Sequence, residues 1–131
     1  MTAQRNRRLP FLFAVALVGG CGGVVDPSQN KIEPFSGTLQ PLGTDGHNFR
    51  VDKNGEIDVK ITAFSNPDAI VELMYGMGSC ANLAPLNAGY RQLNQVGIGG
   101  LVSPGDHCVV IRDSVGTLRQ AATYTITVSH P

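Results

Sequence analysis

The chain has 131 residues and a formal net charge of zero, with ten Lys and Arg against ten Asp and Glu. This length suits one domain and excludes a large multidomain enzyme. Hydrophobic residues make up 42% and charged residues 15%, so the chain can build a core and wholesale disorder is not expected. Three basic residues lie within the first eight positions, which leaves a mildly acidic remainder that is poorly suited to binding nucleic acid.

The N-terminal residues have the pattern of a secretory signal peptide. Met1–Arg8 is polar and basic, Leu9–Val18 is a mainly apolar run, and two glycines follow it. A membrane-spanning helix needs about 20 apolar residues, so this run is too short to remain as an anchor. We therefore expect residues 1–20 to be a signal peptide that is removed on export.

The expected cleavage site resembles a bacterial lipobox, because Val18-Gly19-Gly20-Cys21 places an aliphatic and two small residues before a cysteine. The resemblance implies that residues 1–20 are a lipoprotein signal peptide and that Cys21 becomes the lipidated N-terminus. Several acyl chains there would anchor a small domain to a membrane. Gly22 implies the outer membrane if the cell is Gram-negative, because an Asp at this position often retains lipoproteins at the inner membrane. The alternative is a plain secreted protein with a free Cys21.

Residues 21–34 are expected to be the lipidated cysteine and a flexible tether. The stretch after Cys21 is rich in Gly, Pro, Ser and Asn and shows no apolar period. Thirteen flexible residues span about 20 Å on average, enough to lift a domain clear of lipid headgroups. Packing of Ile32 against the body is the alternative for the end of this segment.

From Phe35 onward, short runs of strand-forming residues alternate with turn signals. In Glu56–Phe64 the side chains of Ile57, Val59, Ile61 and Ala63 share one face, as in a half-buried strand. Asn54-Gly55 before it predicts a hairpin with a type I′ turn, and Gly76–Leu86 is predicted to be a loop. The expected strands are 35–40, 47–51, 56–64, 69–75, 98–102, 107–113 and 122–129. Residues 90–97 are expected to be either a further strand or an irregular segment.

About eight strands at this spacing predict an all-β domain over residues 35–131. The pattern fits an antiparallel β-sandwich or jelly roll. Two cysteines remain if Cys21 is lipidated, and an oxidising compartment allows Cys80 and Cys108 to pair. The alternative of a metal-binding or catalytic thiol is less favoured, because the chain has neither a C-x₂-C motif nor clustered histidines.

A family pattern is carried by five segments of the body: Phe35–Leu39, His47–Val51, Gly55–Ile61, Pro104–Asp113 and Tyr124–Val128. Together they resemble the bacterial pre-peptidase C-terminal domain family. The resemblance covers Phe35–His130 and implies a β-sandwich that accompanies secreted enzymes or stands alone on the envelope. Members are usually non-catalytic and are thought to bind surfaces, proteins or polysaccharides. His107 departs from the family, which usually has an aromatic residue there.

Few residues indicate chemistry. None of the three histidines is part of a nucleophile motif; we expect His107 to be a hydrogen-bonded core residue and His130 to be solvated. Asp45, Asp106 and Asp113 would form a calcium site only if the fold gathered them, and turn aspartates more often cap turns. We therefore expect no metal and no cofactor. Exposed residues near the Cys80 loop are candidates for an interaction patch, with a simple loop covering one end of the sandwich as the alternative. The patch would consist of Tyr75, Met77, Tyr90 and Arg91.

These features lead to one main hypothesis about function. It is a non-catalytic envelope lipoprotein that displays a β-sandwich interaction module for a protein or an envelope polysaccharide. Two alternatives remain open: a small envelope hydrolase built around His47 or His107, and a structural subunit of a larger envelope complex. A membrane contact through the N-terminal lipid is expected in each case, and a nucleic-acid partner in none.

Overall fold

The computed structural model describes residues 26–131. The predicted signal peptide, Cys21 and the first residues of the predicted tether lie outside the described residues. Within residues 26–131, no helix is long and apolar enough to cross a membrane.

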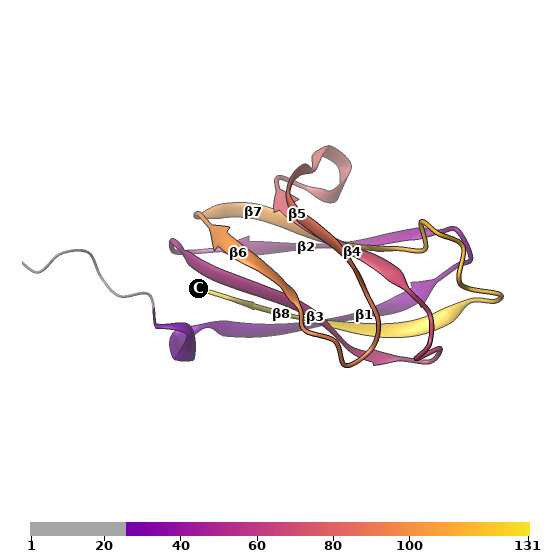
Figure 1. The fold of residues 1–131 in the computed structure, drawn as a ribbon. Coiled ribbons are helices and arrows are strands. Elements are labelled where there is room, and N and C mark those ends of the chain that lie inside the picture. Colours follow the sequence, from indigo (N-terminus) through magenta and orange to yellow (C-terminus); the bar gives the residue numbers. More distant parts are fainter. Residues whose placement is uncertain (1–25) are drawn as a thin grey trace, which may run out of the picture.

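Eight antiparallel strands form two four-stranded sheets that pack face to face (Figure 1). One sheet has the strand order β1-β8-β3-β6 and the other the order β2-β7-β4-β5. The strands are β1 (Lys31–Leu39), β2 (Thr44–Val51), β3 (Gly55–Phe64), β4 (Val71–Met77), β5 (Ala84–Arg91), β6 (Ile98–Val102), β7 (Gly105–Arg112) and β8 (Ala122–His130). Two short 3₁₀ turns, η1 (Pro27–Gln29) and η2 (Cys80–Asn82), accompany them.

The topology is that of a jelly roll. Only β4 and β5 are consecutive strands that pair with each other, and every other connection passes from one sheet to the other. This confirms the prediction of an all-β antiparallel sandwich with about eight strands. The core fills the space between the sheets, because alternate side chains of each strand point inward. Its fully buried members include Val51, Val59, Val71, Leu73, Val109, Ile111, Ile126 and Val128.

The best-patterned predicted strand is present but does not keep one face to its end. Ile57, Val59 and Ile61 are buried as expected, whereas Ala63 is exposed. The pairing with β8 shifts register between Ile61 and Ala63, and a bulge of this kind reverses the alternation beyond it. Phe64 therefore points into the core in place of Ala63.

The predicted Asn54-Gly55 hairpin is wrong. The strands β2 and β3 belong to different sheets, so the short segment between them connects two layers and does not join paired neighbours. Neither Asn54 nor Gly55 has the positive φ that a type I′ turn requires. The dipeptide is therefore part of a crossing between the two sheets.

Two predicted boundaries also change. β1 begins at Lys31, so the last four residues of the predicted tether belong to the sheet, where β1 pairs with β8 along its whole length. Pro34 is compatible with this because β1 is an edge strand. The predicted loop Gly76–Leu86 is shorter than expected: β4 extends to Met77, and β5 begins at Ala84. Since β5 ends at Arg91, residues 92–97 are irregular and only the first two residues of the segment 90–97 belong to a strand.

Candidate functional site

The predicted patch around the Cys80 loop does not form as one surface. Tyr75 was expected to be exposed but is 1% exposed, because it lies at an inward position of β4 between Leu73 and Met77. Burial raises the pKa of its hydroxyl, and the side chain of Asn87 opposes this by hydrogen bonding. Tyr75 is therefore a core residue.

The other three predicted patch residues lie apart. Met77 pairs with Ala84 at one end of the β4–β5 hairpin, and Tyr90 pairs with Glu72 near the other end. Glu72 and Met77 are five residues apart in β4, which corresponds to about 17 Å along a strand. Tyr90 lies beside Glu72, so Met77 and Tyr90 do not share a patch. The guanidinium of Arg91 donates hydrogen bonds to the carbonyl oxygens of Val96 (2.7 Å) and Tyr90 (2.7 Å), which closes the β5–β6 loop.

The apolar surface in this region lies instead on the outer face of the β2-β7-β4-β5 sheet. Met74 in β4 is paired with Ala88 on one side and Val110 on the other, so these side chains form a row across three strands. Tyr90 lies two residues from Ala88 on the same face of β5 and is 52% exposed, and Leu86, at the register shift between β4 and β5, is exposed beside them. We call Met74, Leu86, Ala88, Tyr90 and Val110 the outer-face strip.

An ion pair borders the outer-face strip beside Tyr90. The Nε of Arg112 donates to Oε2 of Glu72 at 2.6 Å. This hydrogen bond lowers the pKa of Glu72 against the opposing effect of burial, and it raises the pKa of Arg112. Glu72 is buried although it lies on the outer face, so the pair is a fixed part of the surface.

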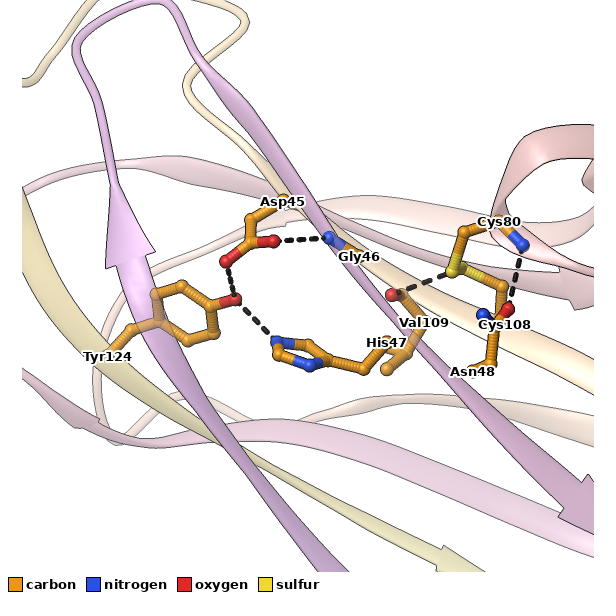
Figure 2. Close-up of a disulfide and its surroundings, with 8 residues drawn as sticks. All are labelled: Asp45, Gly46, His47, Asn48, Cys80, Cys108, Val109 and Tyr124. Atoms are coloured by element: carbon orange, nitrogen blue, oxygen red, sulfur yellow. Dashed lines mark hydrogen bonds between the residues drawn. A yellow bond between two sulfur atoms is a disulfide. The ribbon is translucent and has the colours of Figure 1, made fainter.

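The disulfide borders the other side of the strip. Cys80 and Cys108 are bonded, with their Cα atoms 5.1 Å apart, which confirms the predicted pairing. Figure 2 shows the backbone N–H of Cys80 donating to Oδ1 of Asn48 at 2.8 Å. In the same loop Gly78 adopts φ +92°, and its N–H donates to the carbonyl of Asp106 at 2.8 Å. These contacts hold the β4–β5 loop against β2 and β7.

One polar cluster joins the two sheets along the side where the edge strands β1 and β2 lie. The hydroxyl of Tyr124 donates to Oδ2 of Asp45 at 2.6 Å, and Nε2 of His47 lies 2.6 Å from the same hydroxyl oxygen (Figure 2). Since the single hydroxyl proton goes to the carboxylate, Nε2 of His47 must be the donor in the second bond. Burial, followed by Asp45, raises the pKa of Tyr124.

The neighbours of this cluster show that it is built into the packing. A Cβ on Gly37 would lie 2.5 Å from Oδ2 of Asp45 and 2.7 Å from the Tyr124 hydroxyl, so β1 needs glycine here. The ring of Phe35 stacks on His47 with centroids 5.2 Å apart. The chain from Asp45 through Tyr124 to His47 therefore joins β2 of one sheet to β8 of the other.

The other two histidines are buried at the opposite end of the sandwich. His130 was expected to be solvated, but it is 1% exposed, and its Nε2 lies 2.8 Å from Oε1 of Glu33. Lys31 contacts the same carboxylate at 2.7 Å. The Lys31 contact lowers the pKa of Glu33 against burial, and His130 adds to this effect. The prediction failed because pairing of β8 with β1 and β3 continues to the C-terminal end of β8.

His107 is a core residue, as the inward strand position predicted. Its Nδ1 lies 3.1 Å from the carbonyl oxygen of Gly105 and therefore donates to it. Its Nε2 is buried and has no hydrogen-bond partner within residues 26–131. The ring of Phe49 lies between His107 and His130, with centroid distances of 5.7 and 5.2 Å.

The three aspartates considered for a cation site are not brought together. Asp106 and Asp113 lie at opposite ends of β7, and Asp45 is bound to Tyr124. Within residues 26–131 no three His, Cys, Asp or Glu side chains form a possible metal site. The Asp113 carboxylate accepts instead from the backbone N–H groups of Leu42, Thr117 and Leu118. Burial would raise its pKa, but these hydrogen bonds lower it below its ordinary value.

Sequence reasoning missed the role of the loop residues that Asp113 organises. Leu42 has φ +57° and is 74% exposed, although neither property is typical of leucine. The segment between the predicted strands 35–40 and 47–51 contains Pro41 and Gly43, which are typical turn residues. That pattern predicts a turn and does not predict which distant carboxylate fixes it.

No family model matches the chain, and no curated protein matches it. Seven chains of solved structures match. One is titled "Crystal structure of PirA"; the match has 11% sequence identity and a TM-score of 0.40, and covers 86% of this chain and 100% of that one. A similarity at this level carries no information about function.

Proposed function

We propose that this chain is a non-catalytic interaction module, displayed on a bacterial membrane surface through a lipid on Cys21, that binds an envelope protein or polysaccharide. The lipobox-like residues Val18–Cys21 support the anchor. The body begins with β1 at Lys31, ten residues after Cys21. Ten residues reach at most about 35 Å, so an anchored body would stay close to its membrane.

The observation that carries the binding role is the difference between the two outer faces of the sandwich. On the β1-β8-β3-β6 sheet, hydroxyls on the outer face bond to one another, with Ser36 to Thr125 at 2.8 Å and Thr62 to Thr127 at 2.9 Å. The exposed aliphatic residues of this face, Ile32 and Leu101, lie apart on its two edge strands. The opposite sheet carries the outer-face strip, with exposed Leu86 and Tyr90. Binding of a partner over an apolar surface is favourable because it removes apolar area from water. The outer-face strip is therefore the surface expected to bind.

The borders of the strip suit recognition. The Glu72–Arg112 pair and the disulfide loop are both held by internal bonds, so little side-chain or loop freedom is lost on binding. Tyrosine is favoured at binding surfaces because its ring gives large contact area and its hydroxyl gives a polar tip. Tyr90 is therefore the residue expected to contribute most, to a protein or to a sugar ring.

A non-catalytic role agrees with how the reactive side chains are used. Cys80 and Cys108 are bonded to each other. His47 binds Tyr124, and His130 binds Glu33. Each of these groups already has a structural partner within the body. The resemblance to the pre-peptidase C-terminal domain supports the same role.

Cross-linking in the native cell tests the binding face. A photo-reactive amino acid at Tyr90 should give a discrete adduct with an envelope protein or polysaccharide, whereas the same group at Thr62, exposed on the opposite sheet, should not. Adducts of equal yield from both positions, or none from Tyr90, would contradict the proposed face. If nearly every copy of the chain were cross-linked to one and the same protein, the chain would instead be a structural subunit of a fixed complex.

The anchor is tested separately. Intact-mass measurement of membrane-extracted protein should show a chain that starts at Cys21 and carries a diacylglyceryl group and an acyl chain. The Cys21→Ala variant should move from the membrane fraction to the soluble fraction. An unlipidated wild-type chain in the soluble fraction would contradict the proposed anchor. The proposed binding face would still be tested by the cross-linking experiment.

A further inference from the structure

Three loops meet at the end of the sandwich that lies opposite the C-terminus (Figure 1). They are residues 40–43 between β1 and β2, residues 65–70 between β3 and β4, and residues 113–121 between β7 and β8. The antiparallel order places all three at the same end, because β1, β3 and β7 run toward it. We call this the distal end, and the chain enters β1 at the other end.

Each of these loops exposes one large aliphatic side chain. Leu42 is 74% exposed, Val115 is 54% exposed and Ile70 is 41% exposed. They belong to three separate segments that the fold brings to one end, and Leu42 reaches over Gly116, the neighbour of Val115. A single exposed aliphatic residue is ordinary, but three at the loops of one end form an apolar surface that the body does not cover.

The loops are held in place by bonds between them. Asp113 accepts from the N–H of Leu42 at 3.0 Å, and its own N–H donates to the carbonyl of Gly43 at 3.0 Å. The hydroxyl of Thr117 donates to the carbonyl of Ile70 at 2.7 Å. These bonds join the first loop to the third and the third to the second. They also hold Leu42 at φ +57°, a strained conformation for a leucine that persists only where the surroundings impose it.

Charge at the distal end is nearly balanced. The three loops contain Asp68, Asp113 and Arg119 as their charged residues. Asp113 is fully buried, whereas Asp68 and Arg119 are exposed and opposite in sign. Residues 26–131 as a whole carry seven basic and ten acidic groups, whereas the exposed charges cancel at the distal end. It can approach a lipid surface without strong repulsion or strong attraction.

We propose that the distal end inserts Leu42, Ile70 and Val115 into the acyl-chain boundary of a lipid bilayer. Aliphatic side chains on separate loops suit a fluid phase, which closes around each of them, and the braced loops avoid the cost of ordering on insertion. Because the exposed charges cancel, binding depends on apolar burial and little on headgroup charge. This contact is separate from the outer-face strip and does not depend on the proposed lipid at Cys21.

Vesicle flotation with residues 26–131, which hold all eight strands, the core and the disulfide, tests the proposal without the proposed lipid. The probes are phosphatidylcholine vesicles and vesicles of phosphatidylcholine and phosphatidylglycerol in equal parts. The variant Leu42→Asn with Val115→Ser removes two aliphatic groups, and Asn tolerates the positive φ of position 42. Leu101→Ser is the matched control, because Leu101 in β6 is 76% exposed but lies away from the distal loops.

The body should bind both kinds of vesicle to a similar extent. The double variant should bind at least about tenfold more weakly, whereas Leu101→Ser should bind as the wild type does, and circular dichroism should show all three folded. Absence of flotation with either vesicle would overturn the proposal, as would equal loss in the Leu101→Ser control. Binding confined to phosphatidylglycerol vesicles and removed by salt would also overturn it, since it would indicate attraction to headgroup charge. Failure with vesicles together with a protein cross-link from position 115 would assign the distal end to a protein partner.

Discussion

At the scale of single residues, the three histidines show that burial and partners decide a role that residue type leaves open. His47 joins the two sheets through Tyr124, and His130 is buried against Glu33. His107 is fully buried with one ring nitrogen unpaired within residues 26–131. The same side chain thus serves as a connector, as a buried hydrogen-bond partner of a carboxylate and as a packing group that carries an unsatisfied atom.

The unpaired nitrogen of His107 predicts that its replacement by an apolar residue is tolerated. His107→Leu removes a buried polar atom that lacks a partner and loses one hydrogen bond to Gly105, so the free energy of unfolding should stay within about 1 kcal/mol of wild type or rise. His130→Leu leaves the Glu33 carboxylate without a buried partner. This change should lower the free energy of unfolding by about 1–3 kcal/mol. Urea unfolding at pH 7 compares the two. A larger loss for His107→Leu than for His130→Leu would mean that Nε2 of His107 has a bound partner such as a water molecule.

The Asp113 carboxylate is a residue-scale feature with a large effect, because its two oxygens accept from three backbone N–H groups. Asp113→Asn keeps the shape but turns an NH₂ group toward backbone donors. We expect a loss of about 1–3 kcal/mol in the free energy of unfolding and faster amide hydrogen exchange at Leu42 and Thr117. Unchanged exchange at these two amides would show that the loops hold their conformation without the carboxylate.

At the scale of elements, the disulfide depends on the strand beneath it. A Cβ on Gly46 in β2 would lie 3.1 Å from Sγ of Cys80 and 3.4 Å from Sγ of Cys108. Glycine therefore lets the β4–β5 loop lie close on the sheet. Closing a loop with a sequence separation of 28 residues stabilises the fold by about 3.5 kcal/mol in the chain-entropy model.

A double-mutant cycle separates the glycine from the disulfide. Gly46→Val should cost about 1–3 kcal/mol in the intact protein, because the added methyl groups overlap the sulfur atoms. In the Cys80→Ala, Cys108→Ala background the same change should cost much less, since the bonded sulfur atoms are gone. Chemical denaturation of the four proteins gives the coupling energy. Equal costs in both backgrounds would mean that valine disturbs β2 itself.

The sequence predicted the strands better than their connections. Residues such as Ile57, Val59, Ile126 and Val128 alternate with polar neighbours, and local alternation is what a half-buried strand requires. Asn54-Gly55 failed because a turn motif does not record whether the next strand joins the same sheet. Tyr75 and His130 failed for a related reason, since their burial is provided by strands distant in the chain.

At the scale of the whole molecule, the jelly roll gives its surfaces different properties. One outer face carries pairs of bonded hydroxyl groups, the other carries the outer-face strip, and the distal end exposes aliphatic loops. Each surface combines residues from segments far apart in the sequence. A short chain of this topology can therefore present an apolar sheet face and an apolar loop end at once, and the two contacts can be tested independently.

Three of the carboxylates with lowered pKa values predict how the whole fold responds to acid. Glu33, Glu72 and Asp113 hold their protons less tightly in the folded chain than at their ordinary values of 4.5, 4.5 and 3.8. As the pH falls, the unfolded chain binds protons before the folded chain does. The stability from these groups is therefore present above about pH 4.5 and is lost as the pH falls through the lowered folded pKa values.

Thermal unfolding from about pH 7 to about pH 2.5 should therefore show a falling midpoint in the acid range. Asp113→Asn should lie below the wild type near neutrality, and the gap should narrow in acid, where the wild-type carboxylate also becomes neutral. Glu72→Gln should also lower the unfolding midpoint near neutrality, and this difference should also narrow in acid. Added salt should reduce the difference near neutrality, because the Glu72–Arg112 pair is partly exposed. A gap for Asp113→Asn that stays constant down to the lowest pH would show that hydrogen-bond geometry, and not charge, gives this residue its contribution to stability.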